Sequence, residues 1–293
     1  MRISILTPSF NQGKFLERNI QSVINQDATD VEHIVMDGGS TDETTAILRS
    51  HGNQIRWVSE KDNGQGDALI KALAMASGDI VGWLNVDEYY EPHIFGKVVQ
   101  AFNESPDAVL VFGDVRRVTA DGSTIRINHQ WRFDYKVCQV VTPIVFNCAA
   151  FFRRQHLLDC GGFDASWQYL MDWELYLRFM RGDQKWIRLN STTLANFTMH
   201  PGSKTSLALA GFRSEIHRLH EREFPNWSQD QIHEHKRKQE WRMRYHMMLD
   251  GVIMEKIWFK VVRQRKYRDL FGGLPGKEIP VLSPFLRWIS GEK

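Results

Sequence analysis

Short apolar runs alternate with amphipathic stretches over residues 1–90, and this alternation limits the possible folds more than any other feature. Strands are predicted at 3–7, 32–37, 55–60 and 80–84. Helices are expected between them: one with Phe15, Ile20, Val23 and Ile24 on its apolar side, and two at about 43–51 and 67–76, the last ending near Gly78. Strands and helices at this spacing form right-handed βαβ units, so we predict an α/β fold with a parallel sheet.

In a parallel sheet, the turns that lead from strands into helices all emerge at one edge. Here that edge would collect a set of polar side chains: Thr7, Ser9, Asp37, Asp62, Asn85 and Asp87. Ligands of open α/β sheets bind outside the carboxyl ends of the strands. We therefore expect the functional site at this edge.

The stretch Gly78–Glu88, GDIVGWLNVDE, predicts a buried strand that ends abruptly in polar residues. Neighbouring carboxylates such as Asp87 and Glu88 are costly to crowd together unless a cation or solvent compensates their charge. Hard oxygen ligands suit Mg²⁺ or Mn²⁺ carrying a phosphate. The alternative is a strand that runs into an acidic surface turn, and this stretch alone does not separate the two.

Beyond residue 92 the pattern of elements changes. We predict a helix at 92–103, strands at 108–115, 143–152, 185–189 and 192–198, a hairpin at Asp121-Gly122, a helix at 171–180 and further helices from Ser206.

Composition excludes several classes of protein. The 293 residues carry a net charge of +2, without the basic excess of nucleic-acid-binding proteins. Cys138, Cys148 and Cys160 fit no zinc or disulfide spacing, which favours a reducing cytosol. We expect no signal peptide, and no apolar stretch reaches the roughly 18 residues of a transmembrane helix.

Seven motifs together resemble the family 2 glycosyltransferases, which have the GT-A fold. They are TPSFNQ (7–12), DGGSTD (37–42), SEKDNGQGDA (59–68), GDIVGWLNVDE (78–88), GGFD (161–164), MDWELYLR (171–178) and HPGSKT (200–205). The resemblance covers residues 1–205. It implies an open, twisted, mostly parallel sheet flanked by helices, and inverting transfer of a sugar from a nucleotide-activated donor to a hydroxyl.

By this resemblance, Asp87 and His200 bind Mn²⁺ or Mg²⁺, and Glu88 ligates the metal or orients the turn. Asn85 stands where the family has the first Asp of its metal motif; its amide adds no charge there, but it can bind the donor through a hydrogen bond to a ribose or a metal-bound water. The remaining donor-binding residues implied by the family are Thr7, Pro8, Ser9, Asp37, Asp62, Gly64 and Lys204. A carboxylate at Asp37 suits the imide N–H of uracil, so a UDP-sugar is the expected donor.

Asp172 matches the family's general base, which takes the proton of the acceptor hydroxyl during attack. Glu174 is the rival carboxylate. Residues two apart on a helix do not share a face, so only one of them is expected to point at the sugar.

We expect a catalytic domain at 1–205, with a nucleotide-binding half at 1–90 and an acceptor half at 91–205, followed by a helical extension at 206–293. Residues 235–293 carry a net charge of +8, and 254–271 predict a basic amphipathic helix. Such a helix lies on an anionic membrane or packs on the catalytic body. The first option fits a cytoplasmic enzyme at the inner face of the membrane with a lipid-linked or glycan acceptor.

Three rival interpretations remain. A nucleotidyltransferase would need a glycine-rich phosphate loop after the first strand, which TPSFNQGK lacks. A catalytically silent binding subunit is favoured by Asn85 and Glu88 but not by Asp172 and His200. A dinucleotide-binding oxidoreductase is disfavoured because no G-x-G-x-x-G follows a strand.

Overall fold

The computed structural model describes residues 1–27, 30–143, 145–203 and 209–249. Met1–His246 form one compact unit and Met247–Lys293 a second. The predicted division at residue 205 falls in the segment 204–208, and the predicted helix at 254–271 also lies outside the described residues.

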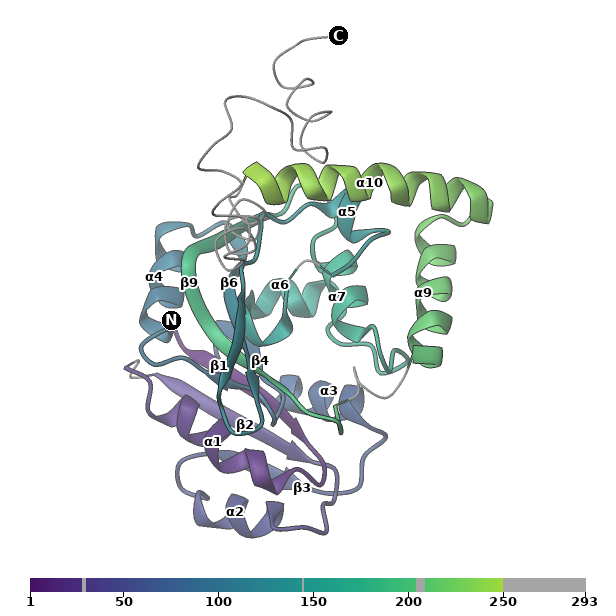
Figure 1. Cartoon of the computed structure of the whole chain (residues 1–293). Helices are drawn as coiled ribbons and strands as arrows, with labels where there is room; N and C mark the ends of the chain where they lie inside the picture. The colour runs from purple at the N-terminus through teal and green to yellow at the C-terminus, as the bar shows by residue number, and fades with distance from the viewer. Residues whose placement is uncertain (28–29, 144, 204–208, 250–293) are drawn as a thin grey trace, which may run out of the picture. The chain divides into compact units, whose positions relative to one another are not determined.

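The first half of the sheet is parallel, as predicted. Its strands are β1 (Ile3–Ser9), β2 (Val31–Asp37), β3 (Arg56–Ser59) and β4 (Ile80–Trp83). They lie side by side in the order β3-β2-β1-β4 (Figure 1). The helices between them are α1 (Gly13–Ile24), α2 (Thr44–Ser50) and α3 (Gln65–Met75). The carboxyl ends of four parallel strands therefore share one edge.

The second half of the sheet is mixed. The strand β8 (Ala150–Arg153) runs antiparallel to both β4 and β6 (Ala108–Thr119). The long strand β9 (Lys185–Met199) then pairs parallel with β6. The remaining strands are β5 (Tyr89–Tyr90), which pairs with β9, and β7 (Thr124–Asn128), which forms the predicted hairpin with β6. The twisted, mostly parallel α/β fold is thus confirmed.

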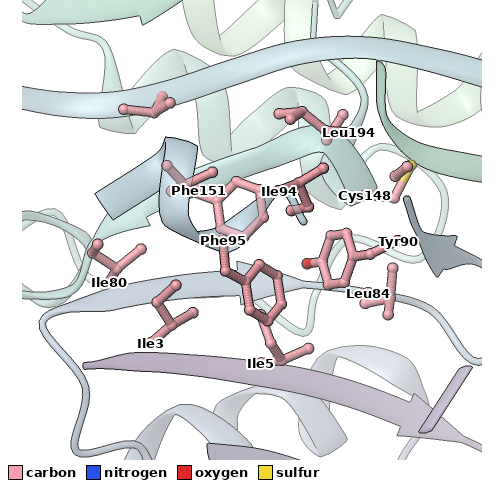
Figure 2. Packing of buried hydrophobic residues seen from close by; sticks show 14 of the residues in the cluster. Ile3, Ile5, Ile80, Leu84, Tyr90, Ile94, Phe95, Cys148, Phe151 and Leu194 are labelled. Carbon is pink, nitrogen blue, oxygen red and sulfur yellow. The ribbon is translucent and has the colours of Figure 1, made fainter. Parts of the chain in front are cut away.

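The other helices follow β5 in the chain. They are α4 (Phe95–Glu104), α5 (Tyr135–Cys138), α6 (Arg154–Asp159), α7 (Met171–Phe179), α9 (Leu209–Glu223) and α10 (Gln229–Leu249). A core cluster joins the sheet to α4 and includes Ile3, Ile5, Phe95, Phe151 and Leu194 (Figure 2). Each of these side chains is fully buried, so this packing fixes β1 against β8 and β9.

β9 is one strand where the sequence predicts two. Phe112 of β6 pairs with Arg188, and Asp114 pairs with Thr193, so residues 189–192 form a bulge in β9. Ser191 lies in this bulge with a φ of 52°. Pairing with β6 on both sides of the bulge keeps the strand continuous as far as Met199.

Two other predictions were wrong. In the described part of the run 143–152, the strand β8 begins only at Ala150, because Asn147–Ala149 form a 3-10 turn, η1. The apolar run signals burial, and short apolar runs do not specify conformation. Gly78 does not end α3, which stops at Met75; a side chain at Gly78 would instead meet the backbone of β1 at 2.8 Å.

In the described residues, no helix has both the length and the apolar character needed to cross a membrane.

Candidate functional site

The turns after β1 and β2 are bonded to each other. The Asn11 backbone N–H donates to Ser40 Oγ at 2.7 Å, and Asn11 Oδ1 accepts from the Thr41 N–H at 2.8 Å. Asp42 accepts from the Gly13 N–H at 2.9 Å and from the Thr44 N–H at 3.1 Å, so it links the start of α1 to the start of α2. These hydrogen bonds hold the segments TPSFNQ and DGGSTD together.

Asp37 ends β2, and its buried carboxylate is held by serines. Oδ1 accepts from Ser40 Oγ at 2.5 Å, and Oδ2 accepts from the Ser40 N–H at 3.0 Å and from Ser59 Oγ at 2.6 Å. The residue therefore joins the end of β2 to the end of β3. If Asp37 also binds a nucleotide base, that contact would be made in addition to these hydrogen bonds.

The three predicted residues at the end of β1 are all buried. Thr7 Oγ1 lies 2.9 Å from His33 Nε2. Burial lowers the pKa of His33 to about 3, so its ring is neutral at physiological pH. The hydroxyl of Ser9 is buried without a hydrogen-bond partner among the described residues.

Asp62 lies against the turn that follows Asp37. A side chain at Gly38 would come within 2.9 Å of the Asp62 carboxylate, so this glycine permits the approach. Asp62 Oδ1 accepts from the Gly64 N–H at 2.8 Å, and Gly64 has a φ of 102°, which favours glycine. The structure thus brings Asp37, Asp62 and Gly64 together at the predicted edge.

The polar side chains in the turn after β4 lie in different surroundings. Asn85 Oδ1 accepts from Gln65 Nε2 at 2.7 Å and from Trp83 Nε1 at 2.9 Å. Glu88 is buried, and its Oε2 accepts from the Asn85 N–H at 2.9 Å and from Asn147 Nδ2 at 3.3 Å. Burial, followed by the Asp87 charge, raises the pKa of Glu88 well above its usual range. This placement favours the orienting role for Glu88.

Asp87 and His200 meet although 113 positions separate them in the chain. Asp87 Oδ2 lies 2.9 Å from His200 Nε2, and Phe15 packs against the imidazole with ring centroids 4.9 Å apart. The carboxylate is 17% exposed, which leaves it accessible to a ligand. His200 directly follows Met199, the last residue of β9, so this strand places the imidazole beside Asp87.

A carboxylate oxygen and an imidazole nitrogen suit Mn²⁺. Within the described ranges, no group of three or more His, Cys, Asp or Glu side chains could hold a metal on its own. An ion at Asp87 and His200 would therefore take further oxygens from a bound phosphate and water, as Mg²⁺ sites at substrate phosphates do. Lys204, the predicted diphosphate contact, lies outside the described residues.

Asp172 lies in the first turn of α7, where its Oδ1 accepts from the Trp173 N–H at 2.7 Å. Burial raises the pKa of Asp172 to about 6, and the backbone hydrogen bonds of its first turn oppose that shift. A carboxyl group with such a pKa is a competent base near neutral pH.

The rival carboxylate, Glu174, points elsewhere. It is 1% exposed and accepts from Arg178 Nε at 2.6 Å and Nη2 at 2.8 Å, and it also pairs with Arg222 of α9. Trp173 is buried and donates its indole N–H to the Cys138 carbonyl, which agrees with a core position. Glu174 therefore supports the structure, and Asp172 is left as the candidate base.

Arg178 also holds the GGFD loop. It donates to the carbonyls of Cys160 at 2.6 Å and Gly162 at 2.8 Å. Gly161 and Gly162 have φ values of 94° and 65°. These conformations turn the loop sharply in front of α7.

Sequence reasoning missed the contribution of α9 to this region. Glu215 accepts hydrogen bonds from the backbone before α7, and Arg222 bonds Glu174 within α7. Both residues fall in the segment that the sequence assigned to an extension. A charged side chain on a polar helix carries no local signal of such a distant partner.

Comparison with known proteins places the chain in a family. The family model described as Glycosyl transferase family 2 matches residues 4–161. The chain is 26% identical to the chondroitin synthase of Escherichia coli over 219 residues, which are 73% of this chain and 31% of that protein. It therefore spans less than a third of that relative.

Two solved structures share the fold. TarS of S. aureus, residues 1–349 in complex with UDP-GlcNAc, aligns over 80% of this chain and 69% of its own, with a TM-score of 0.61 and 18% identity. The mannosyltransferase PcManGT of Pyrobaculum calidifontis, in complex with GDP-Man and Mn²⁺, aligns over 92% of this chain and 82% of its own, with a TM-score of 0.53 and 18% identity. Together with the match to the family model over more than half of the sequence, this establishes that the chain belongs to glycosyltransferase family 2.

Proposed function

We propose that this protein transfers a sugar, with inversion and with the help of a divalent metal, from a UDP-sugar to a hydroxyl of a glycan or lipid-linked acceptor in cell-surface polysaccharide synthesis. The observation that carries the proposal is the contact between Asp87 and His200 at the sheet edge that also holds Asp37 and Asp62. UDP-GlcNAc in TarS and Mn²⁺ in PcManGT support the donor and metal classes by analogy.

In the proposed reaction, Asp87 and His200 would hold the metal, and Ser9, Asp37, Asp62 and Gly64 surround the nucleoside. A divalent ion bound there would supply charge neutralisation for the diphosphate leaving group. Asp172 accepts the proton of the acceptor hydroxyl as the oxygen attacks the anomeric carbon, and the bond from that carbon to the diphosphate breaks.

Calorimetric titration with UDP, GDP, CMP and dTDP, each with and without Mn²⁺, tests the donor site. We expect metal-dependent binding of UDP. Asp87→Asn and His200→Gln should each weaken it by about 10-fold or more, a typical cost for a lost metal contact. The exposed Asp183→Asn removes the same charge as Asp87→Asn and serves as its control.

The catalytically silent binding subunit is the alternative. The contacts of Asn85 with Gln65 and Trp83 weaken it, because they give the departure at position 85 a structural role. Binding of UDP and Mn²⁺ without turnover of any UDP-sugar would favour the silent subunit. The absence of any nucleotide binding would remove the proposed donor site.

We further propose that α10 places the enzyme at an anionic membrane surface. Trp241 is 69% exposed, and the guanidinium of Arg244 lies 5.5 Å from its ring centroid. Arg237, Lys238 and Arg244 are three or four positions from Trp241 and therefore share its face of the helix. Lys and Arg side chains attract anionic lipid head groups, and indole rings favour the membrane–water interface. The cytoplasmic location at the inner face stays a prediction.

A further inference from the structure

Three consecutive backbone N–H groups converge on one carboxylate just before α7. Glu215 Oε1 accepts from Gln168 at 2.7 Å, and Oε2 accepts from Tyr169 at 2.9 Å and from Leu170 at 2.8 Å. The N–H groups at the start of a helix lack partners within the helix and carry partial positive charge. Leu170 is at the N-cap position of α7, so Glu215 anchors the backbone that leads into this helix from α9.

The neighbouring turns of α9 bind the same region. Arg218 donates to the Ser166 carbonyl at 3.1 Å and to Ser166 Oγ at 2.9 Å, and its guanidinium lies 4.1 Å from the Trp167 ring centroid. Arg222 bonds Glu174 inside α7. Residues 215, 218 and 222 lie on one face of α9, so this face holds the loop and the first turn of α7 together.

We propose that Glu215 is a positioning residue for Asp172, which it holds in place through the backbone of residues 168–170. This inference rests on the proposed function, in which Asp172 is the base. Asp172 follows Leu170 by two residues, and its Oδ1 already accepts from the Trp173 N–H. Without the Glu215 carboxylate, the N–H groups of residues 168–170 lose their acceptor, and Asp172 is an acid only two positions from Leu170. Its carboxylate would then turn to cap its own helix and withdraw from the acceptor.

The contacts of the donor-site residues predict which kinetic constant changes when Glu215 is replaced. Asp37, Asp62 and Asp87 bond to Ser59, Gly64 and His200, which all lie outside α9. Donor binding should therefore survive the loss of Glu215, and the loss should appear in the rate of transfer.

The experiment compares Glu215→Ala and Glu215→Gln with Glu221→Ala, an exposed acid on the same helix. We expect Glu215→Ala to lower kcat by about 10-fold to 100-fold, the cost of a small misplacement of a catalytic group. The donor KM and the affinity for UDP with Mn²⁺ should stay within about twofold. Glu215→Gln keeps an acceptor oxygen and should recover part of kcat, and Glu221→Ala should match the wild-type protein.

A double variant separates positioning from general support of the fold. If Glu215 acts through Asp172, adding Glu215→Ala to Asp172→Asn should cause no further loss of kcat, because the two residues act as one unit. A further loss as large as in the wild-type background would overturn the inference, as would a kcat of Glu215→Ala equal to that of Glu221→Ala. If Glu215→Ala does not fold, Glu215→Gln carries the test, and an unchanged kcat in that variant would overturn it.

The same variants give a different result if the proposed function itself is wrong. Full turnover by Asp172→Asn would remove the base assignment and this role of Glu215 together. Failure of the inference alone leaves Asp172→Asn inactive while Glu215→Ala is active.

Discussion

Asp172, the proposed base, predicts a pH-dependent rate of transfer. Burial raises the pKa of its carboxyl from an ordinary value of 3.8 to about 6. Only the deprotonated form accepts a proton, so kcat/KM should rise with pH and level off above about pH 6. Initial rates at saturating Mn²⁺ between pH 5 and 8 measure this limb. A rate independent of pH across pH 6 would contradict the assignment.

The substitution Asp172→Asn should remove transfer and spare the donor site. General base catalysis contributes about 10²-fold to 10⁴-fold, so kcat should fall by that range. Calorimetry should give UDP affinity within about twofold of the wild-type value. The exposed Asp183→Asn is the matched control for the loss of one charge. Intact turnover by Asp172→Asn would exclude Asp172 as the base.

The sequence predicted these residues unevenly, and the reasons are physical. Asp87 and His200 were proposed from motif positions, but their contact depends on the length and curvature of β9. Glu88 follows Asp87 directly, yet its side chain turns inward to bond the Asn85 N–H. Adjacent residues differ in this way because a tight turn sends successive side chains in opposite directions, which composition does not reveal.

At the scale of elements, Glu32 joins β2 to both of its neighbours. Its carboxylate accepts from Ser4 Oγ of β1 at 2.6 Å, from the Ser77 N–H at 2.7 Å and from Arg56 Nη1 of β3 at 2.8 Å. Burial opposes ionisation, but these hydrogen bonds outweigh it and lower the pKa of Glu32 from 4.5 to about 2.

This shift predicts how stability depends on pH. Because the pKa is lower in the folded state, Glu32 stabilises the fold fully above about pH 4.5, and that stabilisation is lost as the pH falls toward 2. At pH 7, Glu32→Gln should lower the free energy of unfolding by about 1–3 kcal/mol, the cost of disrupting buried hydrogen bonds. Urea unfolding from pH 7 down to pH 3 measures the difference, with the exposed Glu43→Gln as control. A difference that stays constant with pH would contradict the prediction.

The parallel half of the sheet was predictable because each of its strands and helices carries a local signal of burial and period. The second half of the sheet was less predictable from the sequence. β9 is continuous because β6 pairs with it on both sides of a bulge, a partner whose register is set by the tertiary fold. The function of α9 was hidden because Glu215 and Arg222 act on residues 45–48 positions away.

At the scale of the molecule, the exposed face of α10 predicts membrane binding. The full chain should co-sediment with vesicles that contain phosphatidylglycerol and not with pure phosphatidylcholine, because attraction to anionic lipid supplements the insertion of Trp241. Trp241→Ala should weaken the binding by about 10-fold, a typical effect of losing an aromatic anchor. Salt should weaken it as well.

The control is Trp227→Ala. Trp227 is 42% exposed, but its ring packs against Phe224 at 4.8 Å and His235 at 5.2 Å between centroids, so it belongs to the fold. Equal losses in both variants would argue against a specific anchor at Trp241. Deleting residues 254–293 tests the contribution of the basic tail separately, and no binding by the full chain would remove the membrane proposal.

The bulge in β9 has a consequence for how chains of this family diverge. Residues 189–192 already interrupt the ladder, so a lineage can gain or lose a residue there without disturbing the pairing on either side. One residue gained or lost between Leu194 and Met199 would reverse the facing of every later side chain and take His200 away from Asp87. Insertions and deletions among related sequences should therefore occur around Ser191 and not in the segment from Leu194 to His200.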